Sequence, residues 1–182
     1  MRAPGFTLIE LMVTLAIVAI LLVLGAPVYT TWIQNMQIRT ATESLVSAMK
    51  LARAEAIKRN VPVTFSLVTG PSAGNSTEWS ITCNPAGPNC PEVGGVIQSD
   101  SLLRNAPHIS VVPTAGDGAI VFSGLGQANP PALPVAALST IDIDNPKLPP
   151  AESRELRVLV VASGELRACD PNVGAAADPR HC

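Results

Sequence analysis

The first 28 residues constrain this chain more than any other segment. A short leader carrying Arg2 is followed by Gly5-Phe6-Thr7-Leu8-Ile9-Glu10 and then by an apolar run from Leu11 to Val28. No charge occurs from residue 11 to residue 38, which exceeds the roughly 20 residues that a membrane-spanning helix needs. A carboxylate at the head of such a run is costly at bilayer depth, so Glu10 is a candidate for a functional contact.

Two simpler explanations account for this segment less well. An ordinary secretory signal peptide has an apolar core of about 7–15 residues that ends at a small-residue cleavage site, and the run here is longer. A plain uncleaved anchor fits the length. It does not explain Glu10, or the Gly5-Phe6 pair directly before Thr-Leu-Ile-Glu.

The Gly-Phe-Thr-Leu-Ile-Glu motif with its apolar run resembles the class III signal of type IV pilins and pseudopilins. The resemblance implies that a prepilin peptidase cuts between Gly5 and Phe6 and methylates the new N-terminus at Phe6. It also implies that Glu10 meets the N-terminal amine of a neighbouring subunit during assembly. Residues 1–5 are then a leader peptide, and residues 6–28 form a transmembrane and assembly helix.

The topology in the membrane follows from the positive charge ahead of the apolar run. Arg2 and the N-terminal amine stay cytoplasmic by the positive-inside rule. We therefore expect a single-pass protein of the inner membrane whose C-terminal domain faces the periplasm, and which later enters a pilus or pseudopilus.

The helix is expected to continue to about residue 59. Residues 29–60 form its amphipathic half, with an apolar stripe at three- and four-residue spacing made by Ile38, Ala41, Leu45, Ala48, Met49, Ala52 and Ala56. Gly25 and Pro27 predict a kink, because proline removes a helix hydrogen bond and clashes with the preceding turn. Asn60 and Pro62 end the helix.

Residues 61–182 predict a periplasmic β domain. Aromatic residues make up only 3% of the chain, so its core is built from Val, Ile, Leu and Ala. Period-two segments predict strands at 61–67, 78–83, 95–98, 108–112, 119–122, 139–143, 156–161 and 165–169. The last two flank Ala162-Ser163-Gly164, a hairpin signal, and residues 124–138 are expected to form a surface loop. The fold class is therefore α+β, with the helix packed on an antiparallel sheet.

Four cysteines agree with an oxidising compartment. They allow three connectivities, of which we favour the two local pairs, Cys83 with Cys90 and Cys169 with Cys182. The alternative is a metal site, but the spacings are not CxxC, and His108 and His181 complete no ligand pattern. We expect no metal and no cofactor.

The segment 44–63 narrows the resemblance, because its Leu-Ala-Arg-Ala-Glu-Ala-Ile-Lys-Arg stretch leads into the first strand. It resembles the helix end of the GspH/FimT family of minor pseudopilins. Arg53, Glu55 and Arg59 in this stretch form either a solvated face or contacts within or between subunits. The resemblance implies a minor subunit that initiates or caps a type IV pilus. One alternative is the same role in a type II secretion pseudopilus. In either role, the expected partners of the protein are prepilin peptidase and other minor and major pilins or pseudopilins.

A third hypothesis is a pilus-tip subunit that binds DNA for uptake. The family resemblance implies arginines near the C-terminus in a Gly-Arg-x-Arg pattern. The matching stretch is Gly164-Glu165-Leu166-Arg167, in which Glu165 replaces the first arginine and only the second arginine, Arg167, is kept. The candidate cations are Arg154, Arg157, Arg167 and Arg180. From residue 60 onward, however, six Lys/Arg face eleven Asp/Glu, a poor balance for binding phosphates. No catalytic motif is evident, so we expect no enzyme.

Overall fold

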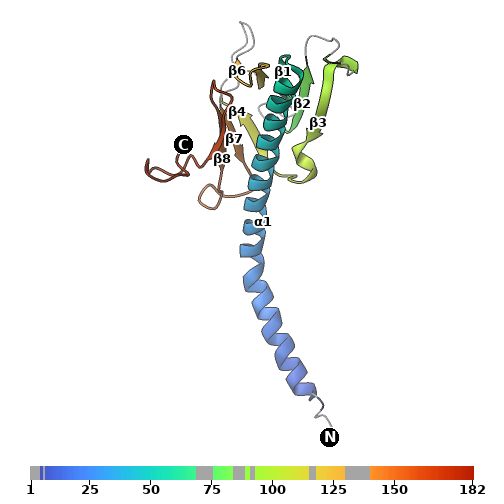
Figure 1. Cartoon of the computed structure of the whole chain (residues 1–182). Coiled ribbons are helices and arrows are strands. Elements are labelled where there is room, and N and C mark those ends of the chain that lie inside the picture. The colour runs from blue at the N-terminus through green and yellow to red at the C-terminus, as the bar shows by residue number, and fades with distance from the viewer. Residues whose placement is uncertain are drawn as a thin grey trace.

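A long helix carries a β domain at its C-terminal end (Figure 1). The computed structural model describes residue 5 and residues 7–68, 76–83, 89–90, 93–114, 118–129 and 140–182. The expected loop at 124–138 is thus described only as far as residue 129.

Helix α1 spans Leu8–Arg59, 52 residues in all. Thr7 begins it as the N-cap, and Asn60 ends it in the left-handed conformation, with φ of 54°. The segments Leu8–Val23 and Val28–Arg59 meet at an angle of 43°, so the bend lies around Gly25 and Pro27. Among the described residues, no single helix has both the length and the hydropathy of a membrane span, but this bent pair has them together.

In the described part of the chain, nine strands form two antiparallel sheets. The first sheet has the order β3-β2-β1-β5-β6 and the second has the order β4-β7-β8-β9. The strands are β1 Val63–Val68, β2 Glu78–Cys83, β3 Val96–Ser101, β4 Ser110–Pro113, β5 Ala119–Phe122, β6 Ala128–Asn129, β7 Thr140–Asp144, β8 Leu156–Val160 and β9 Leu166–Cys169. Two short 3₁₀ helices, η1 Val93–Gly95 and η2 Leu102–Arg104, flank β3.

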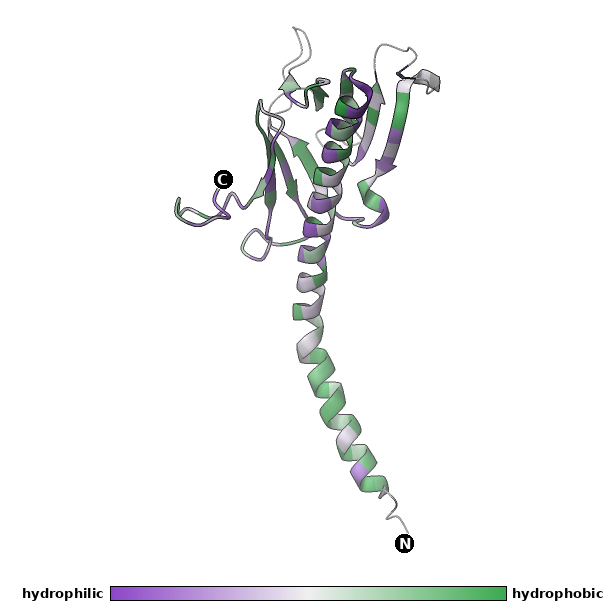
Figure 2. Ribbon diagram, viewed as in Figure 1, coloured by the Kyte–Doolittle hydropathy of each residue, from purple (hydrophilic) through white to green (hydrophobic). Residues whose placement is uncertain are grey.

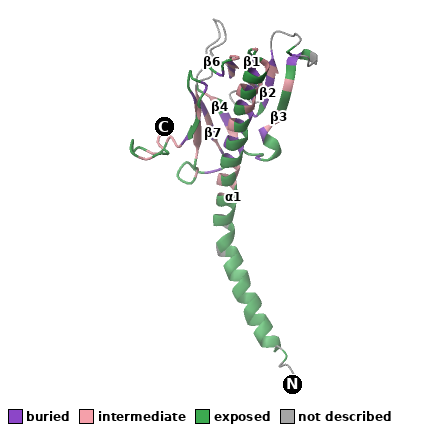
Figure 3. Ribbon diagram, viewed as in Figure 1, coloured by how far each residue is buried: buried purple, intermediate pink, exposed green. Residues whose placement is uncertain are grey.

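The core lies between α1 and both sheets. The predicted helical stripe from Ile38 to Ala56 is buried, and each of its seven members is at most 4% exposed. Phe65 and Phe122 from the first sheet are completely buried, as are Ile141 and Val158 from the second. Figures 2 and 3 show the contrast along α1, because its lower half is apolar and exposed whereas its upper half packs on the domain.

The α+β fold class is confirmed, with two corrections in detail. The predicted single sheet is in fact two sheets, because alternation shows which face of a strand is buried but not which strand it pairs with. The predicted loop contains strand β6, where Val121 pairs with Asn129 and Phe122 with Ala128. Two residues are too few to show alternation, so no period-two signal marks this strand in the sequence.

Candidate functional site

Thr7 caps the N-terminal end of α1, three residues before Glu10. The Thr7 hydroxyl Oγ1 accepts a 3.3 Å hydrogen bond from the Glu10 backbone N–H, and Glu10 lies in the first helical turn. Thr7 and Glu10 thus have the spacing of a capping box, and an acidic residue there also suits the helix dipole. Sequence reasoning missed this cap, although the Thr-x-x-Glu pattern signals it. Gly5 is exposed, while Phe6 lies outside the described residues, so the cleavage and methylation sites stay predictions.

The first half of α1 presents a large apolar surface that no described residue covers. Leu8 is 76% exposed, Leu15 59% and Leu22 68%. Soluble monomers rarely expose contiguous apolar patches of this kind. This surface needs either lipid or the helices of other subunits.

Arg53 fastens the second half of α1 to a turn of each sheet. Its Nε donates a 2.8 Å hydrogen bond to the carbonyl oxygen of Gly126, between β5 and β6. Its second guanidinium nitrogen donates a 3.2 Å bond to the carbonyl of Ser163, between β8 and β9. The two turns also meet directly, through the Ala128 N–H and the Ala162 carbonyl at 3.1 Å. Arg53 therefore contributes to the junction of the two sheets. The sequence alone did not decide between such a contact and a solvated side chain.

Glu55 and Arg59 form a shielded ion pair on the same helical turn. Their side chains are 13% and 15% exposed, and Arg59 Nε lies 2.6 Å from the Glu55 carboxylate. This hydrogen bond lowers the pKa of Glu55, with a smaller contribution from Lys58. The contacts of Arg53, Glu55 and Arg59 described here are made within the chain.

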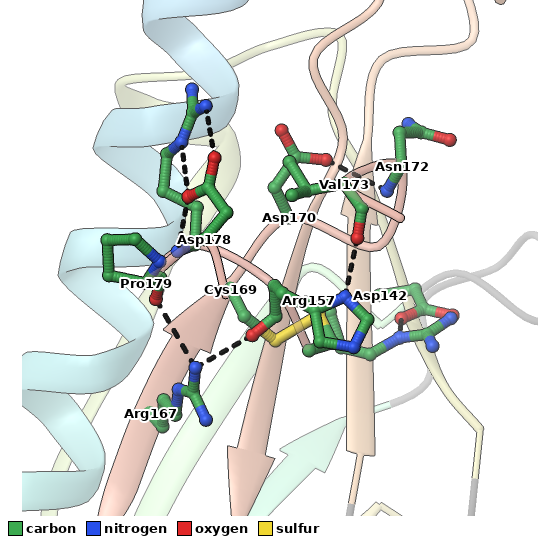
Figure 4. The surroundings of a disulfide bond; sticks show 12 residues. Asp142, Arg157, Arg167, Cys169, Asp170, Asn172, Val173, Asp178 and Pro179 are labelled. Atoms are coloured by element: carbon green, nitrogen blue, oxygen red, sulfur yellow. Dashed lines mark hydrogen bonds and ion pairs between the residues drawn. A yellow bond between two sulfur atoms is a disulfide. The ribbon is translucent and has the colours of Figure 1, made fainter. Parts of the chain in front are cut away.

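Disulfide bonds join Cys83 to Cys90 and Cys169 to Cys182, the two local pairs that we favoured. The second bond ties the C-terminal tail to Cys169 of β9, and Figure 4 shows its surroundings. Arg167 reinforces it by donating to the carbonyl oxygens of Pro179 and His181, at 3.3 and 2.7 Å. The tail is therefore held both by the disulfide bond of Cys182 and by hydrogen bonds to its backbone carbonyls.

The four candidate DNA-binding arginines do not form one patch of free cations. Arg157 makes a bidentate pair with Asp142, directly opposite it on β7, at 2.5 and 2.9 Å. This bond raises the pKa of Arg157. Arg180 pairs with Asp178 at 2.8 Å, and the bond lowers the pKa of Asp178 to about 2.

Arg154 differs from the other three arginines. Its guanidinium forms no hydrogen bond or ion pair with any residue in the described part of the chain. It lines a groove of about 900 Å³ between α1 and the C-terminal region of the domain. Sequence reasoning missed this groove, because its walls come from residues 28–39, 151–156, 168–170 and 179–180. Within the described ranges, no cluster of His, Cys, Asp and Glu is arranged to hold a metal ion.

Comparison with known proteins identifies two matching regions. Residues 41–164 match the family described as Type II transport protein GspH, and residues 1–26 match the Prokaryotic N-terminal methylation motif. No curated protein sequence matches the chain significantly.

Two crystal forms of the type IV minor pilin FimU from Pseudomonas aeruginosa strain PAO1 are similar in structure. The P65 form is 12% identical with a TM-score of 0.47, and the match covers 71% of this chain and 90% of FimU. The P21 form is 11% identical with a TM-score of 0.48, covering 75% and 90%.

Proposed function

The chain belongs to the GspH family of type II transport proteins, and from this premise we propose that it is a minor subunit of a type II secretion pseudopilus. The observation that carries the proposal is the extent of the family match, which runs from the amphipathic half of α1 to the β8–β9 turn. Pilins and pseudopilins are structural subunits, and the protein is not an enzyme. This assignment favours the type II alternative over the type IV pilus role, which the sequence analysis placed first.

The N-terminal methylation motif supports maturation by a prepilin peptidase. In the proposed pathway the protein waits in the inner membrane with its β domain in the periplasm. The peptidase removes residues 1–5 and methylates Phe6. The mature subunit then leaves the bilayer and joins the filament, where helices of other pseudopilins cover its exposed apolar half.

Glu10 has a specific part in this proposal. In the filament it lies among apolar helices, where an unpaired carboxylate is strongly disfavoured. The amine of Phe6 from a neighbouring subunit would neutralise it. The bend around Gly25 and Pro27 lies between the membrane half and the domain half of α1, so it would let the two halves pack in different directions.

DNA binding is not part of the proposed function. Nucleic-acid affinity comes mainly from cations that neutralise phosphates, and Arg157 and Arg180 are already paired with carboxylates. The DNA hypothesis stays a prediction without a supporting contact.

Deletion of the gene tests the proposal. We expect hydrolases to remain in the periplasm while the number of sheared surface pili is unchanged, and the wild-type gene should restore secretion. Reduced pili with normal secretion would instead assign the protein to the type IV pilus machinery, and DNA uptake would then be measured in the same strain.

A further inference from the structure

The groove beneath the β domain begins at the level where α1 would leave the bilayer. From Leu8 to Val28 the helix rises by about 30 Å, the thickness of the hydrocarbon core. Tyr29 and Trp32 follow directly, and their rings stack with centroids 6.1 Å apart. Both are largely exposed, at 61% and 58%. Such aromatic pairs are typical of the membrane–water interface, so in the proposed membrane-held state the lower rim of the groove would lie in the headgroup layer.

The helical wall of the groove combines an apolar stripe with the polar residues Thr31, Asn35 and Arg39. Val28, Trp32 and Met36 recur every four residues along α1 and line it, and all three side chains are at least 43% exposed. They lie at or beyond the end of the membrane-length segment and face no described residue that buries them. Something from outside the chain must cover them if they are to be shielded from water.

The opposite wall carries charges of both signs. Arg154 contributes a guanidinium without a partner in the described part of the chain, and Glu152 and Asp170 contribute carboxylates. Two further arginines line the groove, but Arg39 pairs with Glu43 and Arg180 pairs with Asp178. The loop that bears Arg154 is fixed to the helix by Asn35. The amide of Asn35 donates to the Glu152 carbonyl at 2.9 Å and accepts from the Arg154 N–H at 2.8 Å. The Glu152 carboxylate accepts a further bond from Thr31, at 3.2 Å.

We propose that this groove binds the headgroup of an aminophospholipid, of the phosphatidylethanolamine type, from the outer leaflet of the inner membrane. The phosphate would pair with Arg154 and the primary ammonium group with Glu152, while the upper part of an acyl chain covers Trp32 and Met36. A volume of about 900 Å³ lies within the usual range for a small-molecule site. The inference rests on the proposed membrane-held state of the protein.

The charge pattern favours a lipid over a second copy of the chain. The helix of another copy carries no charge from residue 11 to residue 38. Seated in the groove, that segment would bury Arg154 without a partner and would offer the Glu152 carboxylate no cation, which is strongly unfavourable. The mixed signs also favour a zwitterionic headgroup. Arg39 and Arg180 already pair with Glu43 and Asp178, so a purely anionic lipid would satisfy Arg154 but would offer no cation to Glu152 and Asp170.

The test uses the full-length protein in mild detergent with Trp79→Phe, which leaves Trp32 as the one fluorophore of the two tryptophans. Monomeric short-chain phosphatidylethanolamine, phosphatidylcholine and phosphatidylglycerol are titrated while Trp32 emission is followed. We expect a saturable change that is strongest with phosphatidylethanolamine. Because Arg154→Ala removes a charge-assisted hydrogen bond to the phosphate, it should weaken binding at least about tenfold.

Matched variants separate the alternatives. Arg104→Ala removes another exposed arginine, which does not line the groove, so binding should be unchanged. Glu152→Gln should abolish the preference for phosphatidylethanolamine over phosphatidylcholine, whose ammonium group has no N–H donors. Equal responses to all three lipids, or equal binding by Arg154→Ala and wild type, would overturn the proposal. So would a change in Trp32 emission that depends on protein concentration alone, since that indicates a second copy in the groove.

Retention of the protein in washed membranes is measured in parallel. Loss of membrane retention would contradict the proposed function itself. Normal retention without headgroup-specific binding would overturn only the lipid site.

Discussion

Arg53 on the helix donates a 2.8 Å hydrogen bond from Nε to the carbonyl oxygen of Gly126, in the turn between β5 and β6. The same guanidinium reaches the carbonyl of Ser163, in the β8–β9 turn of the other sheet. The helix, the first sheet and the second sheet therefore meet at one side chain. Its acceptors are main-chain groups, whose positions depend on the turns and not on side-chain identity.

Replacing Arg53 should loosen this junction. Arg53→Ala removes two charge-assisted hydrogen bonds, so we expect a loss of about 2 kcal/mol in the free energy of unfolding. The free energy of unfolding of Arg53→Lys should lie between those of Arg53→Ala and wild type, because an ammonium group lacks the planar fork that reaches two carbonyls. Denaturant unfolding of the full chain in detergent, followed by Trp79 fluorescence, measures both changes.

Lys58→Ala provides the control for that experiment. Lys58 lies on the same helix and is 71% exposed, so its removal should change the stability by less than about 0.5 kcal/mol. Equal losses for Arg53→Ala and Lys58→Ala would show that the junction does not depend on Arg53.

Gly164→Ala should damage the same junction through sterics. Gly164 has φ of +78°, and a Cβ atom there would lie 2.0 Å from the Gly126 carbonyl oxygen. Neither group is a flexible side-chain end, so the two turns must separate, and we expect a loss of more than about 3 kcal/mol. Gly174→Ala is the matched control, because nothing lies within 4 Å of its added Cβ. Similar melting temperatures for the two variants would contradict the close approach.

The sequence predicted the parts of this structure that depend on local pattern. The helical stripe, eight of the strands and the β8–β9 hairpin follow from hydrophobic period and turn residues. The division into two sheets, the short strand β6 and the acceptors of Arg53 depend on which segments meet in space, and no local pattern records that. The four arginines show the same limit, since the sequence does not reveal that Asp142 faces Arg157 across two strands.

Acid should weaken the fold partly through Glu55. Its pKa in the folded protein is lowered from the ordinary 4.5 by the hydrogen bond to Arg59. A lowered pKa means that the stabilisation is complete above pH 4.5 and is lost as the pH falls through the folded-state value. Glu55→Gln should therefore flatten the dependence of unfolding free energy on pH below pH 4.5. The pair of Glu43 with Arg39 is 67% exposed at the glutamate, so Glu43→Gln should leave the profile unchanged. An identical profile for Glu55→Gln and wild type would contradict the assignment.

Loss of the C-terminal disulfide should free the tail without unfolding the domain. The bond between Cys169 and Cys182 closes a segment with a sequence separation of 13, and Cys182 lies at the end of the chain. In the double variant with serine at both positions, we expect trypsin to cleave after Arg180 at least about tenfold faster, because local opening controls proteolysis. Mass spectrometry of timed digests measures the rate. The double serine variant of Cys83 and Cys90 is the control, and faster cleavage there as well would indicate general unfolding.

We propose two separable roles for Glu10, one local and one between subunits. Its position three residues after Thr7 suits a capping box, a function that glutamine also performs. Only the carboxylate, however, can neutralise the amine of a neighbouring Phe6. We therefore expect Glu10→Gln to give a mature-size protein in normal amounts in the membrane, with at least about tenfold less in sheared filaments, because an ion pair buried among apolar helices loses one partner.

Gly5→Val should instead stop maturation and leave the longer precursor. Immunoblots of membrane and filament fractions distinguish the two variants. Normal incorporation of Glu10→Gln would mean that the cap alone explains Glu10, and a mature-size band from Gly5→Val would refute the predicted cleavage site.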